Sequence, residues 1–157
     1  MHIPAYLAAQ RVQFETLYHP PAFTAQKRAH YLHVPGNIVA KSVLLRSPED
    51  FVVAVLPATM HVDTSRLSQA VGKELRLATH EEIPPNFPDC EWGVVPPFGK
   101  LYGLETILED SVRPDDRLFF ESNSHFEGIR MSCRDFEEVE KPGRAQFGHK
   151  RPQGPPR

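Results

Sequence analysis

Two nearly continuous apolar runs form the clearest pattern in the chain. Residues 37–46 and 51–56 are rich in β-branched side chains, and Ser47-Pro48-Glu49-Asp50 between them has turn chemistry. Together they predict a β-hairpin. Since neither run alternates with polar residues, we expect both strands to be buried on both faces or to form part of a barrel. Shorter extended segments are predicted at residues 17–19, 75–77, 100–102, 104–108, 117–120 and 126–131.

Short helices are predicted between these strands. Their expected N-caps are Thr24, either Asp63 or Thr64, Thr79 and Ser132. Thr79 also forms a capping-box pattern with Glu82. The predicted helices cover residues 3–14, 25–33, 65–71, 80–83 and 133–139, and residues 57–63 are interpreted as a loop. Such alternation of strands with short helices indicates a mixed α/β or α+β domain.

The length of 157 residues is enough for one domain and too short for two ordinary ones. We expect a single domain over residues 1–140. Residues 141–157 are basic, rich in Gly and Pro and free of acidic side chains, so a flexible tail is predicted there. The tail is either inert or a weak RNA-contacting arm. Since the formal net charge is −2, any nucleic-acid contact must depend on a local basic patch.

Several functional classes lack their sequence signals. No apolar run reaches the roughly 18 residues of a membrane span, and the N-terminus does not resemble a signal peptide. The two cysteines, Cys90 and Cys133, lack a CxxC partner, and the eight histidines include no HExxH pair. We therefore expect reduced thiols, no metal, no cofactor, no membrane partner and a cytoplasmic location.

The most unusual local sequence is a loop rich in Gly and Pro, Cys90-Glu-Trp-Gly93-Val-Val-Pro96-Pro97-Phe98-Gly99. Glycine lets a backbone approach a ligand closely, whereas proline fixes φ and removes a donor. The loop is expected to present the backbone N–H groups of Val94 and Val95 to a bound oxygen, supported from behind by Pro96 and Pro97. A purely structural loop is the alternative interpretation.

Two other segments carry candidate chemistry. Lys41 stands inside the apolar run at 37–46, where it either points at an anionic group or protects an exposed strand edge. Asn123, Ser124 and His125 form a polar loop that can hydrogen-bond an acyl group. With the Gly/Pro loop, they are the parts of a site that stabilises an oxyanion. Cys90 is a conceivable nucleophile, although a packing role fits it better.

The order of these segments resembles the YbaK/prolyl-tRNA-synthetase-associated domain family of aminoacyl-tRNA editing deacylases. The resemblance extends from about Thr24 to Val139. Its motifs are the helix at Thr24 with Ala29, the strand containing Lys41, Leu56-Pro-Ala…Val62-Asp63, the segment from Gly93 to Gly99, and His125-Phe-Glu-Gly128-Ile129. The family implies a mixed-sheet, barrel-like α/β fold flanked by short helices.

The resemblance also implies an activity. Members hydrolyse the ester between a wrong amino acid and tRNA, often tRNA for proline, and the 2′-hydroxyl of the substrate is thought to aid the attacking water. By this resemblance Lys41 holds the tRNA 3′ end, Gly93 and Pro97 shape the acyl pocket, and His125 lines it. Further contacts to substrate are expected from Val94, Val95, Pro96, Phe98, Asn123, Ser124, Thr24, Lys27 and Arg28.

The expected partner is the aminoacylated 3′ end of tRNA, with a synthetase or an elongation factor as a possible assistant. Lys27 and Arg28 depart from the acidic residues usual in the family, and their basic face could lie along an RNA backbone. Two alternatives stay open: a non-catalytic module that binds tRNA or a synthetase, and a small-ester hydrolase that uses Cys90.

Overall fold

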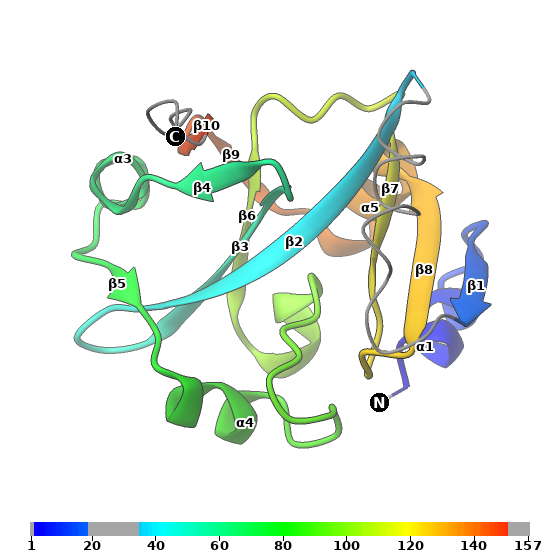
Figure 1. Ribbon diagram of the computed structural model, residues 1–157, viewed down its shortest axis with the longest axis horizontal. Helices are drawn as coiled ribbons and strands as arrows, with labels where there is room; N and C mark the ends of the chain where they lie inside the picture. The colour runs from blue at the N-terminus through cyan, green and yellow to red at the C-terminus, as the bar shows by residue number, and fades with distance from the viewer. Residues whose placement is uncertain (1, 19–34, 151–157) are drawn as a thin grey trace, which may run out of the picture.

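A mixed β-sheet is the centre of the protein (Figure 1). The computed structural model describes residues 2–18 and 35–150. The main sheet has the order β1-β8-β7-β2-β3-β6-β9, with β5 also paired to β2, and β4 pairs with β10 separately. The strands are β1 Glu15–Tyr18, β2 Asn37–Arg46, β3 Phe51–Pro57, β4 Met60–Val62, β5 Arg76–Leu77, β6 Glu105–Glu109, β7 Arg117–Glu121, β8 Glu127–Ser132, β9 Gly143–Ala145 and β10 Gly148–Lys150.

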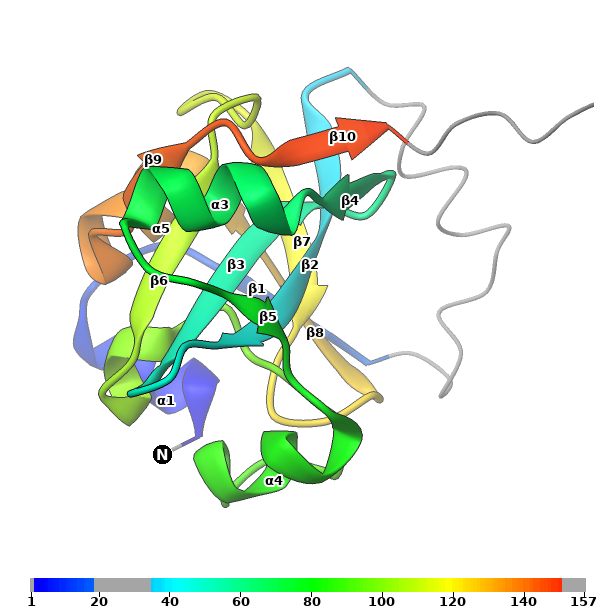
Figure 2. The ribbon, with the colours of Figure 1, turned by 90° about the vertical axis from the view of Figure 1, so that its left-hand side faces the viewer.

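Short helices cover the sheet, and α3 lies across one face of it (Figure 2). The helices are α1 Ile3–Ala9, α3 Thr64–Val71, η1 His80–Glu82, α4 Ile83–Asn86, η2 Gly99–Tyr102 and α5 Cys133–Glu140. The predicted caps at Asp63 and Ser132 are confirmed, because their side chains accept from Arg66 N and Asp135 N. The capping box of Thr79 and Glu82 is confirmed as well. No helix among the described residues is long and apolar enough to span a membrane.

The side chains of β3 alternate between two hydrophobic cores. Val53 and Val55 join the main core, together with buried residues of α1 and α5. Val52, Ala54 and Leu56 join the second core beneath α3. The predictions of a hairpin and of a mixed sheet flanked by short helices are therefore confirmed. Burial on both faces holds for β3 but not for β2, where most residues are only half-buried.

The sheet splits between β2 and β7. The two strands pair in parallel only from Asn37–Arg117 to Val39–Phe119. Beyond Val39, β2 continues along β3 and crosses diagonally away from β7 (Figure 1). This separation, which we call the β2–β7 fork, leaves room for a cavity inside the sheet.

Three local predictions were wrong. The first helix ends at Ala9 rather than residue 14, because Arg11 adopts a left-handed conformation with φ of 61°. Residues 100–102 do not form a strand but belong to the 3₁₀ helix η2, which is followed by the C-cap Gly103 with φ of 74°. The predicted loop at 57–63 contains β4, whose partner β10 is distant in sequence.

The prediction of a tail from residue 141 onward is also wrong as far as Lys150. β9 pairs with β6, β10 pairs with β4, and Phe147 between them is fully buried. The buried carboxylate of Glu109 accepts hydrogen bonds from the N–H groups of Phe147 (2.7 Å) and Gly148 (2.6 Å). The burial of Phe147 and the hydrogen bonds to the distant Glu109 carboxylate thus order this segment, although its local sequence is polar. Residues 151–157 lie outside the described residues.

Replacing Glu109 by glutamine is expected to loosen this C-terminal segment. The other carboxylate oxygen of Glu109, Oε1, accepts from Ser111 N–H at 3.1 Å. Because both oxygens accept from backbone N–H groups, the NH₂ group of a glutamine would have to face at least one of these donors. We expect the free energy of unfolding in urea to fall by about 1–3 kcal/mol. The matched control is Glu105→Gln, at the exposed start of the same strand. Equal stability of the two variants would contradict the anchoring role of Glu109.

A second buried carboxyl, Glu140, links α5 to the end of the Gly/Pro loop. Its Oε2 atom accepts from Thr106 Oγ1 (2.6 Å) and Lys100 N (2.9 Å). Thr106 Oγ1 in turn accepts from Gly99 N at 3.0 Å. Glu140 Oε1 has no hydrogen-bond partner within the described structure. Burial raises the pKa of Glu140 above its usual value of 4.5.

The raised pKa predicts a specific pH dependence of stability. Above pH 4.5 the unfolded chain releases this proton while the folded chain retains it, so the Glu140 contribution to stability falls with rising pH until the folded carboxyl also ionises. We expect Glu140→Gln to gain in Tm relative to wild type as pH rises from 4.5 to 8.5. Glu138→Gln, on the exposed side of α5, is the control. A Tm difference independent of pH would refute this account.

Candidate functional site

A cavity of about 380 Å³ occupies the β2–β7 fork. β2 and β7 form its two sides, and residues from three loops complete it. Three predicted site segments meet there, because Lys41, Gly93 and His125 all line the cavity. The lining residues are Val39, Ala40, Lys41, Ser42, Ala58, Gly93, Val95, Phe119, Phe120, Glu121 and His125.

Lys41 is half-buried in the middle of β2, opposite Leu56 of β3. Pairing of β2 with β7 stops at Val39, so Lys41 stands where one edge of β2 is open inside the sheet. Val39, two residues earlier and on the same face, packs with Phe119 in a small cluster. The strand therefore brings a cation beside an apolar surface inside the cavity.

The Gly/Pro loop begins with a tight turn. Val94 N–H donates to Glu91 O at 3.1 Å, and Gly93 has φ of +89°, a conformation that favours glycine. The prediction that Val94 offers its N–H to a ligand is therefore wrong, since the turn already uses that donor. Within the described residues, the N–H groups of Gly93 and Val95 donate to no protein acceptor.

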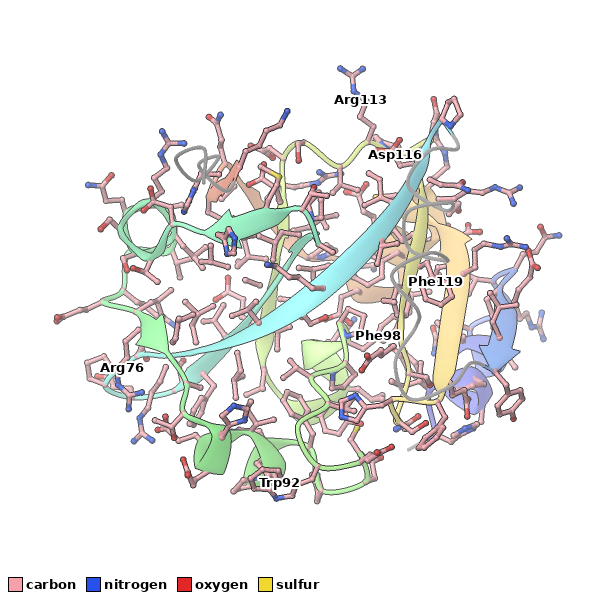
Figure 3. The ribbon with its side chains drawn as sticks, viewed as in Figure 1. Arg76, Trp92, Phe98, Arg113, Asp116 and Phe119 are labelled. Carbon is pink, nitrogen blue, oxygen red and sulfur yellow. The ribbon has the colours of Figure 1, made fainter. Side chains whose placement is uncertain are left out.

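The second half of the loop supports the cavity from behind. Pro96, Pro97 and Phe98 are buried, and none of them lines the cavity. The Phe98 ring lies in the main core, 5.5 Å from Phe120 and 5.4 Å from Phe136 between ring centroids (Figure 3). The structure thus places Phe98 in the core and not at the predicted ligand surface, because its large apolar ring fills the space behind the loop.

His125 connects β7 to the Gly/Pro loop. Its Nδ1 atom lies 3.0 Å from Glu121 Oε2, and its Nε2 atom lies 3.2 Å from the carbonyl oxygen of Trp92. Its backbone N–H donates to Glu91 Oε2 at 3.1 Å. In a trans peptide the C=O and N–H groups point in opposite directions, so the contact to Trp92 O fixes the direction of Gly93 N–H.

Asn123 and Ser124 lie beside the cavity and not in its lining. Asn123 accepts from Ile3 N through Oδ1 (2.8 Å) and from Glu91 N through its carbonyl oxygen (2.7 Å). Ser124 Oγ accepts from Phe126 N at 3.2 Å. Their polar groups hold loops together, which explains a polar sequence without a direct ligand contact.

Thr24, Lys27 and Arg28 lie outside the described residues. Conversely, Glu121 and Phe119 line the cavity and were not predicted as site residues, and Ala58, which also lines it, was noted only as part of the motif Leu56-Pro-Ala. A carboxylate four residues before His125 was an available signal for Glu121.

The space that the Phe119 ring occupies depends on a glycine in the neighbouring strand. A Cβ atom at Gly128 would lie 2.5 Å from Phe119 Cζ, so any larger residue there would displace the aromatic ring. Gly128 belongs to the motif noted at residues 125–129, and its lack of a side chain leaves room for the Phe119 ring.

Cys90 is half-buried and does not line the cavity. Burial raises the pKa of its thiol, which lowers the fraction of nucleophilic thiolate. The arrangement therefore disfavours Cys90 as a nucleophile. Among residues 2–18 and 35–150, no cluster of three or more His, Cys, Asp or Glu side chains could hold a metal ion.

Two solved structures share this fold. Hypothetical protein APE2540 has a TM-score of 0.79 and 16% sequence identity, with 94% of this chain and 99% of that chain covered. A proposed trans-editing enzyme for prolyl-tRNA synthetase has a TM-score of 0.68 and 18% identity, with 87% of each chain covered.

Sequence comparison points in the same direction. A proline–tRNA ligase of Kosmotoga olearia is 27% identical over 121 residues, covering 74% of this chain and 20% of the ligase. The chain thus spans about a fifth of the length of that relative. Residues 19–139 match the family described as the aminoacyl-tRNA editing domain. The match covers most of the chain and confirms the resemblance in the motifs, so this protein belongs to the aminoacyl-tRNA editing domain family.

Proposed function

We propose that this protein is a freestanding deacylase that hydrolyses the ester of a mischarged tRNA. The observation that supports this most directly is the meeting of Lys41, Gly93 and His125 around one cavity. The names of the ligase and of the trans-editing relative favour tRNA for proline, carrying a small non-cognate amino acid, as the substrate. A synthetase or an elongation factor is proposed to assist delivery.

The size and chemistry of the cavity suit a small aminoacyl ester. A volume of about 380 Å³ lies near the lower end of the roughly 300–1,000 Å³ typical of small-molecule sites. Val39, Ala58 and Phe119 form an apolar surface for an aliphatic side chain. Lys41 supplies a cation for the phosphate or the carbonyl oxygen at the tRNA 3′ end.

In the proposed reaction a water molecule attacks the carbonyl carbon of the ester. The N–H groups of Gly93 and Val95 are candidate donors to the oxyanion that forms. The bond from the carbonyl carbon to the ribose oxygen then breaks, and that oxygen leaves with a proton derived from the water. As the family resemblance implies, the neighbouring 2′-hydroxyl relays this proton, and the products are the free amino acid and uncharged tRNA.

In this proposal His125 acts as a positioning residue as well as a wall of the cavity. Glu121 orients the ring through Nδ1, and Nε2 holds the Trp92 carbonyl, so the pair fixes the peptide that carries Gly93 N–H. Misplacement of a donor by about 1 Å can cost about a hundredfold in rate. The proposed rate therefore depends on the support of this loop as well as on the donors.

Lys41→Ala is expected to lower deacylation by about 10²–10³-fold, because it removes a charge beside the developing oxyanion. The measurement is amino-acid release from tRNAs charged with alanine, cysteine, serine, threonine or proline. Lys73→Ala removes the same charge from an exposed lysine paired with Asp50 outside the cavity, and serves as the control. Binding of tRNA by the wild-type protein without any release would instead favour a non-catalytic module.

His125→Ala is expected to lower kcat about tenfold to a hundredfold with a smaller effect on KM, because the Gly93 peptide loses its support. Since Glu121 is proposed to act through His125, Glu121→Ala should have little further effect in the His125→Ala background. The double-mutant cycle is measured on the tRNA species that the wild-type protein deacylates. Independent, additive losses from the two substitutions would refute the coupling.

A further inference from the structure

Trp92, the only tryptophan in the chain, is 63% exposed although its side chain is large and apolar. It projects at the periphery of the molecule (Figure 3). Trp92 immediately precedes Gly93 of the cavity, and its carbonyl oxygen contacts His125. Phe126, directly after His125, is a second exposed aromatic residue. Each of these exposed aromatic residues is thus adjacent in sequence to a residue that lines the cavity.

The exposed ring is held in a defined orientation. The rings of Trp92 and His80 are nearly parallel, with an interplanar angle of 6° and centroids 6.4 Å apart. His80 lies in η1, which begins with the capping box of Thr79 and Glu82. Glu82 also accepts hydrogen bonds from Arg46 and Arg76 at 2.7 and 2.9 Å. Because these hydrogen bonds already hold the rings of Trp92 and His80 in place, a flat ligand would bind them with a lower cost in conformational entropy.

The cavity cannot hold the whole 3′ end of a tRNA. Its volume of about 380 Å³ accommodates a small aminoacyl group and part of the terminal nucleoside. The unpaired nucleotides that precede that nucleoside must therefore lie outside the cavity. Trp92 is one residue away from the cavity wall at Gly93, so it is within reach of those nucleotides.

We propose that the Trp92–His80 pair is a stacking platform for an unpaired base next to the terminal nucleoside of the tRNA. The inference rests on the proposed function and adds a contact to its substrate. Every base has a π-face, and stacking on aromatic side chains is the common way to bind single-stranded RNA. Since the net charge of −2 gives no overall attraction to a polyanion, affinity must come from local contacts such as this one.

Fluorescence of the single tryptophan tests the platform without requiring catalysis. The probe is the RNA tetranucleotide 5′-ACCA-3′, compared with the same backbone carrying abasic riboses in place of both cytidines. We expect saturable quenching by the intact tetranucleotide and at least about fivefold weaker binding of the abasic one. Absence of quenching, or equal binding of both probes, would overturn the proposal and leave the exposed ring available to a protein partner.

Kinetics provide the second test, through the ratio of kcat/KM for the mischarged tRNA to that for the same amino acid esterified to adenosine. Trp92→Ala should lower this ratio about fivefold to 150-fold, as expected for one lost base stack. Trp92→Phe should restore part of it, because phenylalanine retains a π-face.

The control is Leu77→Ala, which removes an apolar side chain of similar exposure, 55%, that has no π-face. An unchanged ratio in Trp92→Ala, or an equal change in Leu77→Ala, would overturn the platform. If the wild-type protein cleaves neither ester, the proposed function fails, while the fluorescence result still decides whether Trp92 stacks on a base.

Discussion

The point at which β2 separates from β7 determines the rest of the architecture. Parallel pairing stops after Val39 and Phe119, although both strands continue. β2 can leave its neighbour because its other edge pairs with β3 over seven residue pairs, from Ala40–Pro57 to Arg46–Phe51. Ala58 N–H in addition donates to Val39 O at 2.7 Å where the strands part. A fork inside a sheet normally exposes backbone groups that need partners, and here those groups border the proposed ligand site.

The fork needs a rigid cover, and the Gly/Pro loop provides one because both of its ends are fixed. At its start, Glu91 N–H donates to Asn123 O and the Trp92 carbonyl contacts His125. At its end, Phe98 is inserted in the core, and Gly99 N–H reaches Glu140 through Thr106. The loop that carries the proposed donors is thus held to the rest of the fold at both ends. If only one end of the loop were held, the donors would shift with any movement of the element that holds that end.

Sequence patterns predicted which residues lie at the site better than they predicted the contacts that these residues make. Lys41 stood out because a charge interrupts an apolar strand, and Gly93 stood out because glycine and proline cluster around it. Neither pattern shows which backbone donor is free, so the use of Val94 N–H inside a turn could not be predicted. Phe98 was misassigned for a similar reason, since an aromatic residue in a loop can face a ligand or the core. The C-terminal strands escaped prediction because Phe147 is held by Glu109, 38 residues earlier.

The nature of the side chains around the cavity is consistent with the proposed catalysis by positioning. Lys41 is carried by a strand, and the candidate donors Gly93 and Val95 are backbone groups of a braced loop. Cys90, the intrinsically strongest nucleophile nearby, is turned toward Tyr102 and Asn123, and burial raises the pKa of its thiol. Such a site aligns an ester with fixed donors but contributes little reactivity of its own. It suits a substrate that brings a hydroxyl beside its own scissile bond, as the terminal ribose of an aminoacyl-tRNA does.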